Sequence, residues 1–232
     1  MAVDPLTGNL WQTENGMQVY DEINLVENRF NSGWSAITGP SDRVDAITDP
    51  VLFEKGIQSL EGFVYSDPEF SWYNAVGSTA IAFPDMTNFA KYQDWLFVGD
   101  FSNGRIYKFQ LNSDRTDFIF SDTNLKDLVY DPDDNLNEIL FAETFPGGVT
   151  DIKFGNDAMY VVSPFYHGSI YKIYPKQLIP ESSQINIPDT PILEIEETPE
   201  EFPYTGIILA IIGTIVVGII LVIRKKRRYL KN

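Results

Sequence analysis

The sequence predicts an all-β protein: a partial β-propeller of about three to four blades, followed by an extended linker and one C-terminal transmembrane α-helix. Three observations predict this arrangement. Residues 1–174 contain short aromatic and β-branched runs between Gly, Pro, Asn and Asp turns, without a sustained helical period. A hairpin pattern recurs in this region. Near the end of the chain, an uncharged segment is followed by a basic cluster.

The repeat consists of two short strands, a turn that ends in Gly, and the tripeptide Ile-Tyr-Lys. LFVGDFSNGRIYKF (96–109) matches MYVVSPFYHGSIYKI (159–173), and a weaker copy occupies residues 5–26. Repeated antiparallel hairpins are typical of propeller blades, and at roughly 40–60 residues per blade this region supplies about half of a six-bladed ring. Because an open half-ring exposes strand edges, we expect this chain to be the carboxy-terminal part of a longer protein.

The charge of the chain is unevenly distributed. Among 232 residues, all 33 Asp and Glu but only 11 of the 17 Lys and Arg precede residue 206, which gives that part a formal charge of −22. Such an acidic body repels phosphate backbones, so we expect no nucleic-acid partner. The absence of cysteine excludes disulfides, thiolate zinc sites and a cysteine nucleophile.

The last part of the chain is predicted to attach the protein to a membrane. Residues 175–203 contain six prolines, seven acids and one lysine, a composition typical of an extended, semi-rigid stalk. Residues 204–223 are 20 uncharged residues, and a helix of this length spans roughly 30 Å, the thickness of a bilayer core. The basic residues in 224–232 predict a cytoplasmic tail, which places the propeller outside the membrane.

Two features of this membrane segment leave alternatives open. Small residues recur every four positions at Gly206, Ala210, Thr214 and Gly218. Either they allow close packing in a helix-mediated homodimer, or Gly and Thr are simply common in membrane helices. The chain also begins without a basic and apolar signal segment. The protein is therefore expected either to insert tail-first, with its body in the cytosol, or to lack its true start; the half-propeller favours the second alternative.

Several stretches in order along residues 1–174 carry a family resemblance. They are DPLTGNLWQTENG (4–16), DEINLVENRFNSGW (21–34), YSDPEFSW with STAIAF (65–83), LFVGDFSNGRIYKF (96–109), and TDIKFGNDAMYVVS with GSIYKI (150–173). Together they resemble the glucose/sorbosone dehydrogenase family, also called soluble aldose dehydrogenases. The resemblance implies a six-bladed propeller that oxidises aldose sugars with pyrroloquinoline quinone (PQQ) and calcium.

The resemblance also implies four site residues. Gly16 and Met17 match the positions whose backbone carbonyls help to hold the PQQ calcium in the family. Glu22 matches a ligand of a second, structural calcium, and Asp42 corresponds to a further aspartate of that site. Ser32 stands where the family has a tyrosine. Clustered oxygen ligands suit calcium; the alternative is that the Asp-Glu pair caps a turn and faces solvent.

The residues expected to hold PQQ itself differ from those of the family. The family uses a lysine on a blade turn and two arginines beside a motif similar to Thr-Asp-Ile; the matching residues here are Ser102 and Asn103, then Gly148 and Thr150. PQQ is a tricarboxylate that needs cations with bidentate geometry, so we do not expect this chain to bind it. The family's general-base histidine belongs to an earlier blade, and His167, the only histidine here, is expected to be a turn residue.

Two further patterns have a structural alternative. Four aromatic residues could stack on a sugar or form a blade core: Tyr65, Phe70, Trp72 and Tyr73. Residues 131–138 resemble a calcium loop but lack the Gly and Glu that an EF-hand requires, because Leu136 and Ala142 occupy those positions. A solvated acidic turn is the interpretation that we favour for this segment.

Two functions follow from these observations. The first is the membrane-anchored part of an extracytoplasmic sugar dehydrogenase, inactive in the chain as given because its histidine and its PQQ-binding cations are missing. The second is a non-catalytic, calcium-stabilised propeller that acts as a binding or scaffold module at the cell surface, with sugar as one candidate ligand.

Overall fold

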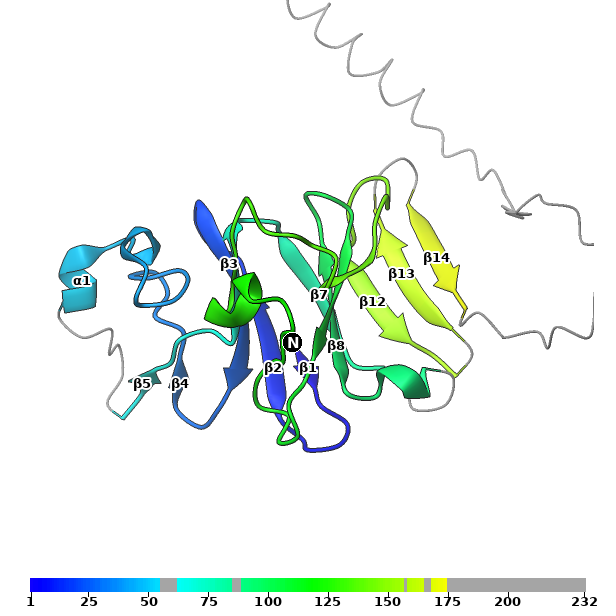
Figure 1. Cartoon of the computed structure of the whole chain (residues 1–232), viewed down its shortest axis with the longest axis horizontal. Helices are drawn as coiled ribbons and strands as arrows, with labels where there is room; N and C mark the ends of the chain where they lie inside the picture. The colour runs from blue at the N-terminus through cyan, green and yellow to red at the C-terminus, as the bar shows by residue number, and fades with distance from the viewer. Residues whose placement is uncertain (55–61, 85–88, 157, 165–167, 175–232) are drawn as a thin grey trace, which may run out of the picture. The chain divides into compact units, whose positions relative to one another are not determined.

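The computed structural model describes residues 1–54, 62–84, 89–156, 158–164 and 168–174 (Figure 1). These residues belong to the first of two compact units, Met1–Leu178. The predicted stalk, membrane helix and basic tail (175–232) and the single histidine lie outside the described residues. Within the described part of the chain, no helix has the length and apolar character needed to cross a membrane.

Strands dominate the described residues, as predicted, and most belong to three successive sheets. The first sheet has the order β1-β2-β3-β6-β10, with β1 (Ala2–Val3), β2 (Leu10–Glu14), β3 (Val19–Val26), β6 (Phe70–Asn74) and β10 (Val129–Tyr130). The second has the order β11-β9-β8-β7, with β7 (Ser78–Ala82), β8 (Trp95–Asp100), β9 (Ile106–Gln110) and β11 (Leu140–Ala142). The third consists of β12 (Asp151–Phe154), β13 (Met159–Ser163) and β14 (Ser169–Ile173).

A segment between β3 and β6 leaves the first sheet and adds the other elements of this region. It contains the parallel pair β4 (Phe30–Asn31) and β5 (Val64–Tyr65), the 3-10 turn Val44–Ala46 and the short helix α1 (Pro50–Glu54). Further 3-10 turns are Ala90–Tyr92 and Asn124–Asp127. The short helix and these turns are the only helical elements of the described residues, so the expectation of a β protein is correct there.

The hairpins predicted from the repeat are present. In both β8–β9 and β13–β14 the strands pair antiparallel, and the Ile-Tyr-Lys tripeptide lies in the second strand. The first strands of successive hairpins also meet, because β2 contacts β7 and β7 contacts β12. Figure 1 shows the sheets following one another in this order. Neighbouring blades of a propeller are arranged in this way.

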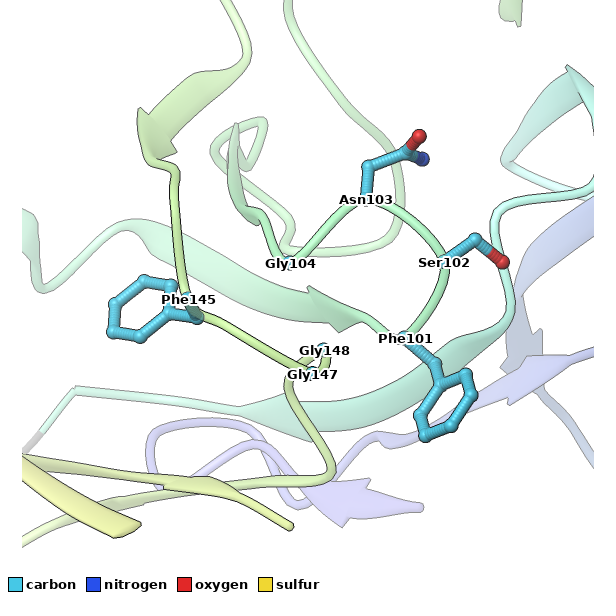
Figure 2. Close-up of a pocket in the computed structure, with 7 residues that line it drawn as sticks. All are labelled: Phe101, Ser102, Asn103, Gly104, Phe145, Gly147 and Gly148. Atoms are coloured by element: carbon cyan, nitrogen blue, oxygen red, sulfur yellow. The ribbon is translucent and has the colours of Figure 1, made fainter. Parts of the chain in front are cut away.

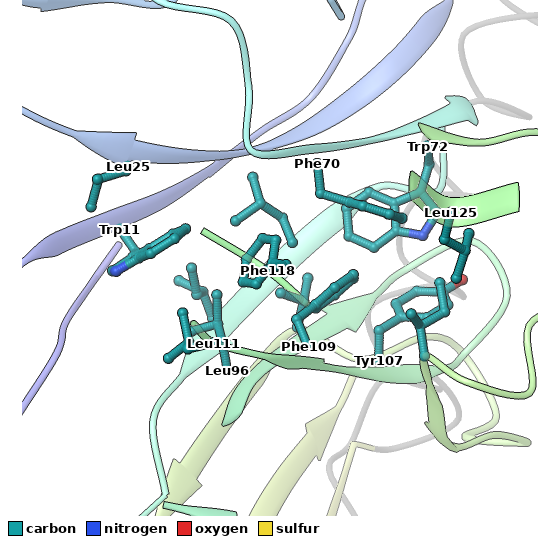
Figure 3. Packing of buried hydrophobic residues seen from close by; sticks show 14 of the residues in the cluster. Trp11, Leu25, Phe70, Trp72, Leu96, Tyr107, Phe109, Leu111, Phe118 and Leu125 are labelled. Atoms are coloured by element: carbon teal, nitrogen blue, oxygen red, sulfur yellow. The ribbon is translucent and has the colours of Figure 1, made fainter. Parts of the chain in front are cut away.

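The second sheet is buried on both faces, which explains the apolar run of β8. Leu96 and Val98 belong to a core shared with the first sheet, whereas Phe97 belongs to a core shared with the third sheet. Successive side chains of a strand point to opposite faces, so a strand between two cores must be apolar at every position. The core between the first two sheets is mostly aromatic (Figure 3).

This core decides between the two interpretations of the aromatic residues. Phe70 and Trp72 are fully buried between the first and second sheets, so the core interpretation is correct for both. Tyr65 and Tyr73 pack against a third cluster, which includes Tyr20, on the opposite face of the first sheet. The segment between β3 and β6 supplies much of that cluster, so it covers the face that the second sheet leaves free.

The Glu69 carboxyl gives this fold a testable pH dependence. Burial raises its pKa to about 8, well above the ordinary value of 4.5, although the Leu25 amide donates a hydrogen bond to it. Because the folded state holds this proton more tightly, its stability falls as pH rises from about 4.5 to about 8. We expect Glu69→Gln to raise the Tm at pH 8.5 and to leave the Tm at pH 4 nearly unchanged, as measured by thermal denaturation. An equal change in Tm at both pH values would contradict this prediction.

Candidate functional site

The turn between β2 and β3 holds the two residues predicted to supply carbonyl ligands. The Gly16 amide donates a 3.0 Å hydrogen bond to Asp21 Oδ1, and a Cβ at Gly16 would lie 2.0 Å from the Val19 carbonyl oxygen. Only glycine therefore fits this turn. Met17 is 60% exposed. The turn is rigidly held and accessible, while the assignment of these carbonyls to calcium stays a prediction.

Asp21 connects this turn to the next sheet. Its Oδ2 accepts hydrogen bonds from the backbone amides of Val76 (3.0 Å) and Ser78 (2.9 Å), at the start of β7. Asp21 and Glu22 are 0% and 1% exposed, so the alternative in which this pair faces solvent is wrong. As neighbours on one strand, they point to opposite faces of the sheet. Sequence reasoning missed the role of Asp21, although an acid within an otherwise apolar strand was a signal of a buried partner.

Glu22 lies on the face that the segment between β3 and β6 covers. Its carboxylate accepts hydrogen bonds from the Asn24 side chain (3.0 Å) and from the Gly39 backbone amide. Burial raises the pKa of Glu22 to about 7, and the nearby Glu14 contributes to the shift. Asp42, in contrast, is an exposed loop residue. Among the described residues, no group of three or more His, Cys, Asp or Glu is placed to hold a metal ion, so calcium at Glu22 would need neutral oxygen donors as well.

A hollow of about 420 Å³ lies between two loops of the second sheet (Figure 2). Its lining includes Ser102, Asn103 and Gly148, three of the four residues that occupy the family's PQQ-clamping positions. The other lining residues are Phe101, Gly104, Phe145 and Gly147. The structure therefore brings these sequence-predicted positions together in one place. Thr150 is half-buried beyond this lining, where its hydroxyl donates to the Val162 carbonyl oxygen at 3.3 Å.

The turn on one side of the hollow is held by Asp100, which is fully buried. Its carboxylate accepts hydrogen bonds from the Asn103 backbone amide (2.5 Å), the Asn103 side chain (2.8 Å) and the Tyr107 hydroxyl (2.7 Å). Burial, followed by the charge of Asp100, raises the pKa of the Tyr107 hydroxyl far above its ordinary value. Because these bonds fix both the backbone and the amide of Asn103, the turn is preorganised rather than adaptable.

The lining of this hollow does not fit PQQ. It contains neither lysine nor arginine. The adjacent Arg105 lies 3.6 Å from the Glu143 carboxylate and hydrogen-bonds the Tyr107 side chain, so it is already neutralised. A tricarboxylate in this hollow would lack the charge-assisted hydrogen bonds that offset its loss of hydration. Hydroxyl, amide, aromatic and backbone groups suit a neutral ligand instead.

Gly104 and Gly148 allow the two loops around the hollow to approach closely. At Gly104, φ is +62° and a Cβ would lie 2.1 Å from the Phe145 carbonyl oxygen; at Gly148, φ is +85° and a Cβ would lie 2.3 Å from the Phe101 carbonyl oxygen. The Phe145 amide donates a 3.1 Å hydrogen bond to the Gly104 carbonyl oxygen, which joins the loops. A side chain at either glycine must push the backbones apart.

We expect Gly104→Ala to destabilise the fold more than Gly8→Ala does. Both positions are left-handed, with φ of +62° and +80°, so each substitution costs about 1–2 kcal/mol of backbone strain. Nothing lies within 4 Å of a Cβ at Gly8, whereas Gly104→Ala adds a backbone clash worth about 1–3 kcal/mol. Urea denaturation of the two variants measures the difference. Equal losses would show that the loops separate without cost.

The acidic turn at residues 131–138 serves a structural role in part. Asp131 lies 3.1 Å from an Arg43 guanidinium nitrogen, which also contacts Asp127 at 2.7 Å. The Asp134 side chain accepts a 2.8 Å hydrogen bond from the Asp131 amide. These contacts join the turn to the segment that covers the first sheet.

The three sheets, with their adjoining first strands and shared cores, define a β-propeller type of fold that is similar to glucose dehydrogenases. The sequence model described as Glucose / Sorbosone dehydrogenase matches residues 1–139. This chain therefore belongs to the glucose/sorbosone dehydrogenase family. A search among curated proteins found no match.

Solved structures show the same fold. A crystal structure of a glucose dehydrogenase has a TM-score of 0.53 and 20% identity, over 75% of this chain and 43% of the other. A second glucose dehydrogenase has a TM-score of 0.54 and 19% identity, over 76% and 43%. The soluble aldose sugar dehydrogenase from Escherichia coli, in its apo form, has a TM-score of 0.50 and 18% identity, over 74% and 43%. This chain thus spans 43% of the length of each of these proteins.

Proposed function

We propose that this chain is a membrane-anchored, extracytoplasmic member of the family whose propeller unit does not itself oxidise sugars with PQQ. In this proposal it acts as a binding or scaffold module at the cell surface. The observation that carries it is the neutral lining of the hollow between residues 101–104 and 145–148. The family membership supports a sugar as the ligand class, and the hydroxyl and amide groups of the lining are compatible with one.

The electrostatics of the chain support the same proposal. Residues 1–205 carry a formal charge of −22, so a polyanionic cofactor meets a repulsive field unless local cations offset it. A neutral ligand meets no such barrier. The predicted span at 204–223 and the basic residues after it support the anchoring and the orientation.

The experiment uses the purified full chain in detergent, with calcium, PQQ, an aldose and a redox dye. We expect no dye reduction above the protein-free reaction and no PQQ retained in equilibrium dialysis. A glucose dehydrogenase serves as the positive control for the assay. The double variant Ser102→Lys/Thr150→Arg, which places cations at two of the clamping positions, is expected to retain more PQQ than the original chain. Dye reduction that rises with the amount of the original chain would overturn the proposal.

The proposed orientation can be tested by labelling, because the chain contains no cysteine. Single variants Ser113→Cys, at an exposed loop position, and Lys231→Cys, in the basic tail, report on the two ends of the protein. In intact cells we expect a membrane-impermeant maleimide to label only Ser113→Cys. Labelling of both variants after lysis is the control. Protection of Ser113→Cys in intact cells would instead place the body in the cytosol.

A further inference from the structure

A row of polar side chains crosses the face of the first sheet opposite the aromatic core. Glu14 on β2 pairs with Glu22 on β3, and Glu22 pairs with Ser71 on β6. Asn24 lies two residues beyond Glu22 and therefore points to the same face. Directly opposed residues on neighbouring antiparallel strands have Cβ atoms about 5 Å apart. The register thus gathers four oxygen-bearing side chains in one place.

Three of these side chains present an oxygen without a hydrogen-bond partner. Glu14 Oε1, Asn24 Oδ1 and Ser71 Oγ are buried and have no partner among the described residues. Asn24 and Ser71 are each 0% exposed, and Glu22 is 1% exposed. The Asn24 amide nitrogen donates to Glu22 Oε2 at 3.0 Å, which fixes the free Asn24 oxygen beside the Glu22 carboxylate. Buried polar atoms in native proteins are almost always paired, so three together require an explanation.

The charges of this row require one as well. None of the ion pairs among the described residues includes Glu14 or Glu22. Two neighbouring buried carboxylates without a cation repel each other and lose hydration. A bound divalent cation would remove both costs, because it would neutralise the pair and take the free oxygens as ligands.

We propose that Glu14, Glu22 and Asn24, together with Ser71, bind a calcium ion on the covered face of the first sheet. The donor set is entirely oxygen, two carboxylates with an amide and a hydroxyl, which hard cations prefer. Calcium tolerates irregular geometry and six to eight ligands, whereas magnesium demands a near-ideal octahedron. The site uses Glu22, which the family resemblance assigns to calcium, but it replaces Asp42 with Glu14 and Asn24.

The segment between β3 and β6 closes this site, so the ion would also join that segment to the sheet. The Gly39 amide donates to Glu22 Oε1, and the Ser32 side chain hydrogen-bonds Glu14. Both residues belong to the covering segment, and each is bound to one of the two carboxylates. The calcium site is therefore expected to stabilise the fold, whether or not the hollow binds a sugar.

The test measures the Tm of the full chain in detergent after removal of metals with EDTA and dialysis, then with added calcium or magnesium. Ligands that bind only the folded state raise its Tm. We expect calcium to raise the Tm and magnesium at the same concentration to raise it less. Terbium luminescence, sensitised by the protein's aromatic residues and competed by calcium, gives a second readout. No rise in Tm together with no competed terbium signal would overturn the proposal.

Four variants distinguish this ligand set from the one that the resemblance implies. Glu14→Gln and Glu22→Gln should lose the calcium-dependent Tm shift. Both should also raise the Tm in EDTA, because each removes one of two repelling carboxylates, so failure to fold is not the expected outcome. Asp42→Asn and the exposed control Asp114→Asn should keep the shift. If Asp42→Asn loses the shift while Glu14→Gln keeps it, the proposed ligand set is wrong.

Discussion

Replacing Arg115 with methionine is expected to destabilise the protein by about 3–5 kcal/mol, because it leaves a buried carboxylate without its partner. The Arg115 side chain is 6% exposed and its Nε lies 2.6 Å from Asp4 Oδ2, whose side chain is 0% exposed. Burial alone would raise the pKa of Asp4, but the hydrogen bond from Arg115 holds it below its ordinary value. Arg115 also donates to the Gln93 carbonyl oxygen at 3.2 Å, so it joins the chain start to the second sheet.

Two further variants make this prediction specific. Arg43→Met removes ion pairs in which the side chains are 30–50% exposed, and we expect a loss of about 0–1 kcal/mol. The double variant Asp4→Asn/Arg115→Met removes both charges and should recover part of the loss. Chemical denaturation of the three variants is the measurement. If Arg115→Met and Arg43→Met lose equal stability, Asp4 does not depend on its buried partner.

The second large effect is expected for Phe70→Ala, in the aromatic core of Figure 3. The Phe70 ring is fully buried, and its centroid lies 5.2, 4.8 and 5.5 Å from those of Trp72, Phe109 and Phe120. Phe109 belongs to the second sheet, so this ring fills the space between two sheets. The substitution removes its buried area and leaves a cavity, and we expect it to cost about 3–5 kcal/mol.

A graded series tests this mechanism. Phe70→Leu leaves a smaller cavity and should lose less stability than Phe70→Ala. Val44→Ala, at a position that is 85% exposed, should change stability by less than about 0.5 kcal/mol. Thermal and urea denaturation of the three variants give the order. Phe70→Ala with the stability of Val44→Ala would mean that the core repacks without cost.

The strands were predictable because their apolar pattern is local. The run at Leu96–Val98 and the Ile-Tyr-Lys repeats identified β8, β9 and β14 without knowledge of their neighbours. The meaning of adjacent acids was not predictable in the same way. Asp21 and Glu22 look alike in sequence, but one accepts backbone amides from the next sheet and the other lies under the covering segment.

The candidate site was predictable only where the family resemblance aligned with a turn. Ser102, Asn103 and Gly148 come together in the hollow as that alignment implies. The row of Glu14, Asn24 and Ser71 depends on the register of three strands, and β6 begins 44 residues after β3 ends. A pattern confined to one strand does not determine such a pairing.

The order of the strands has a consequence for how this unit unfolds. The outer strand β10 of the first sheet comes after β9 of the second sheet in the chain, and β11 then returns to the second sheet. Cleaving the backbone near Ala75 would separate the first sheet from the strand that finishes it. Neither fragment would own a full set of partners, so the first two sheets should melt in a single calorimetric transition rather than as independent modules.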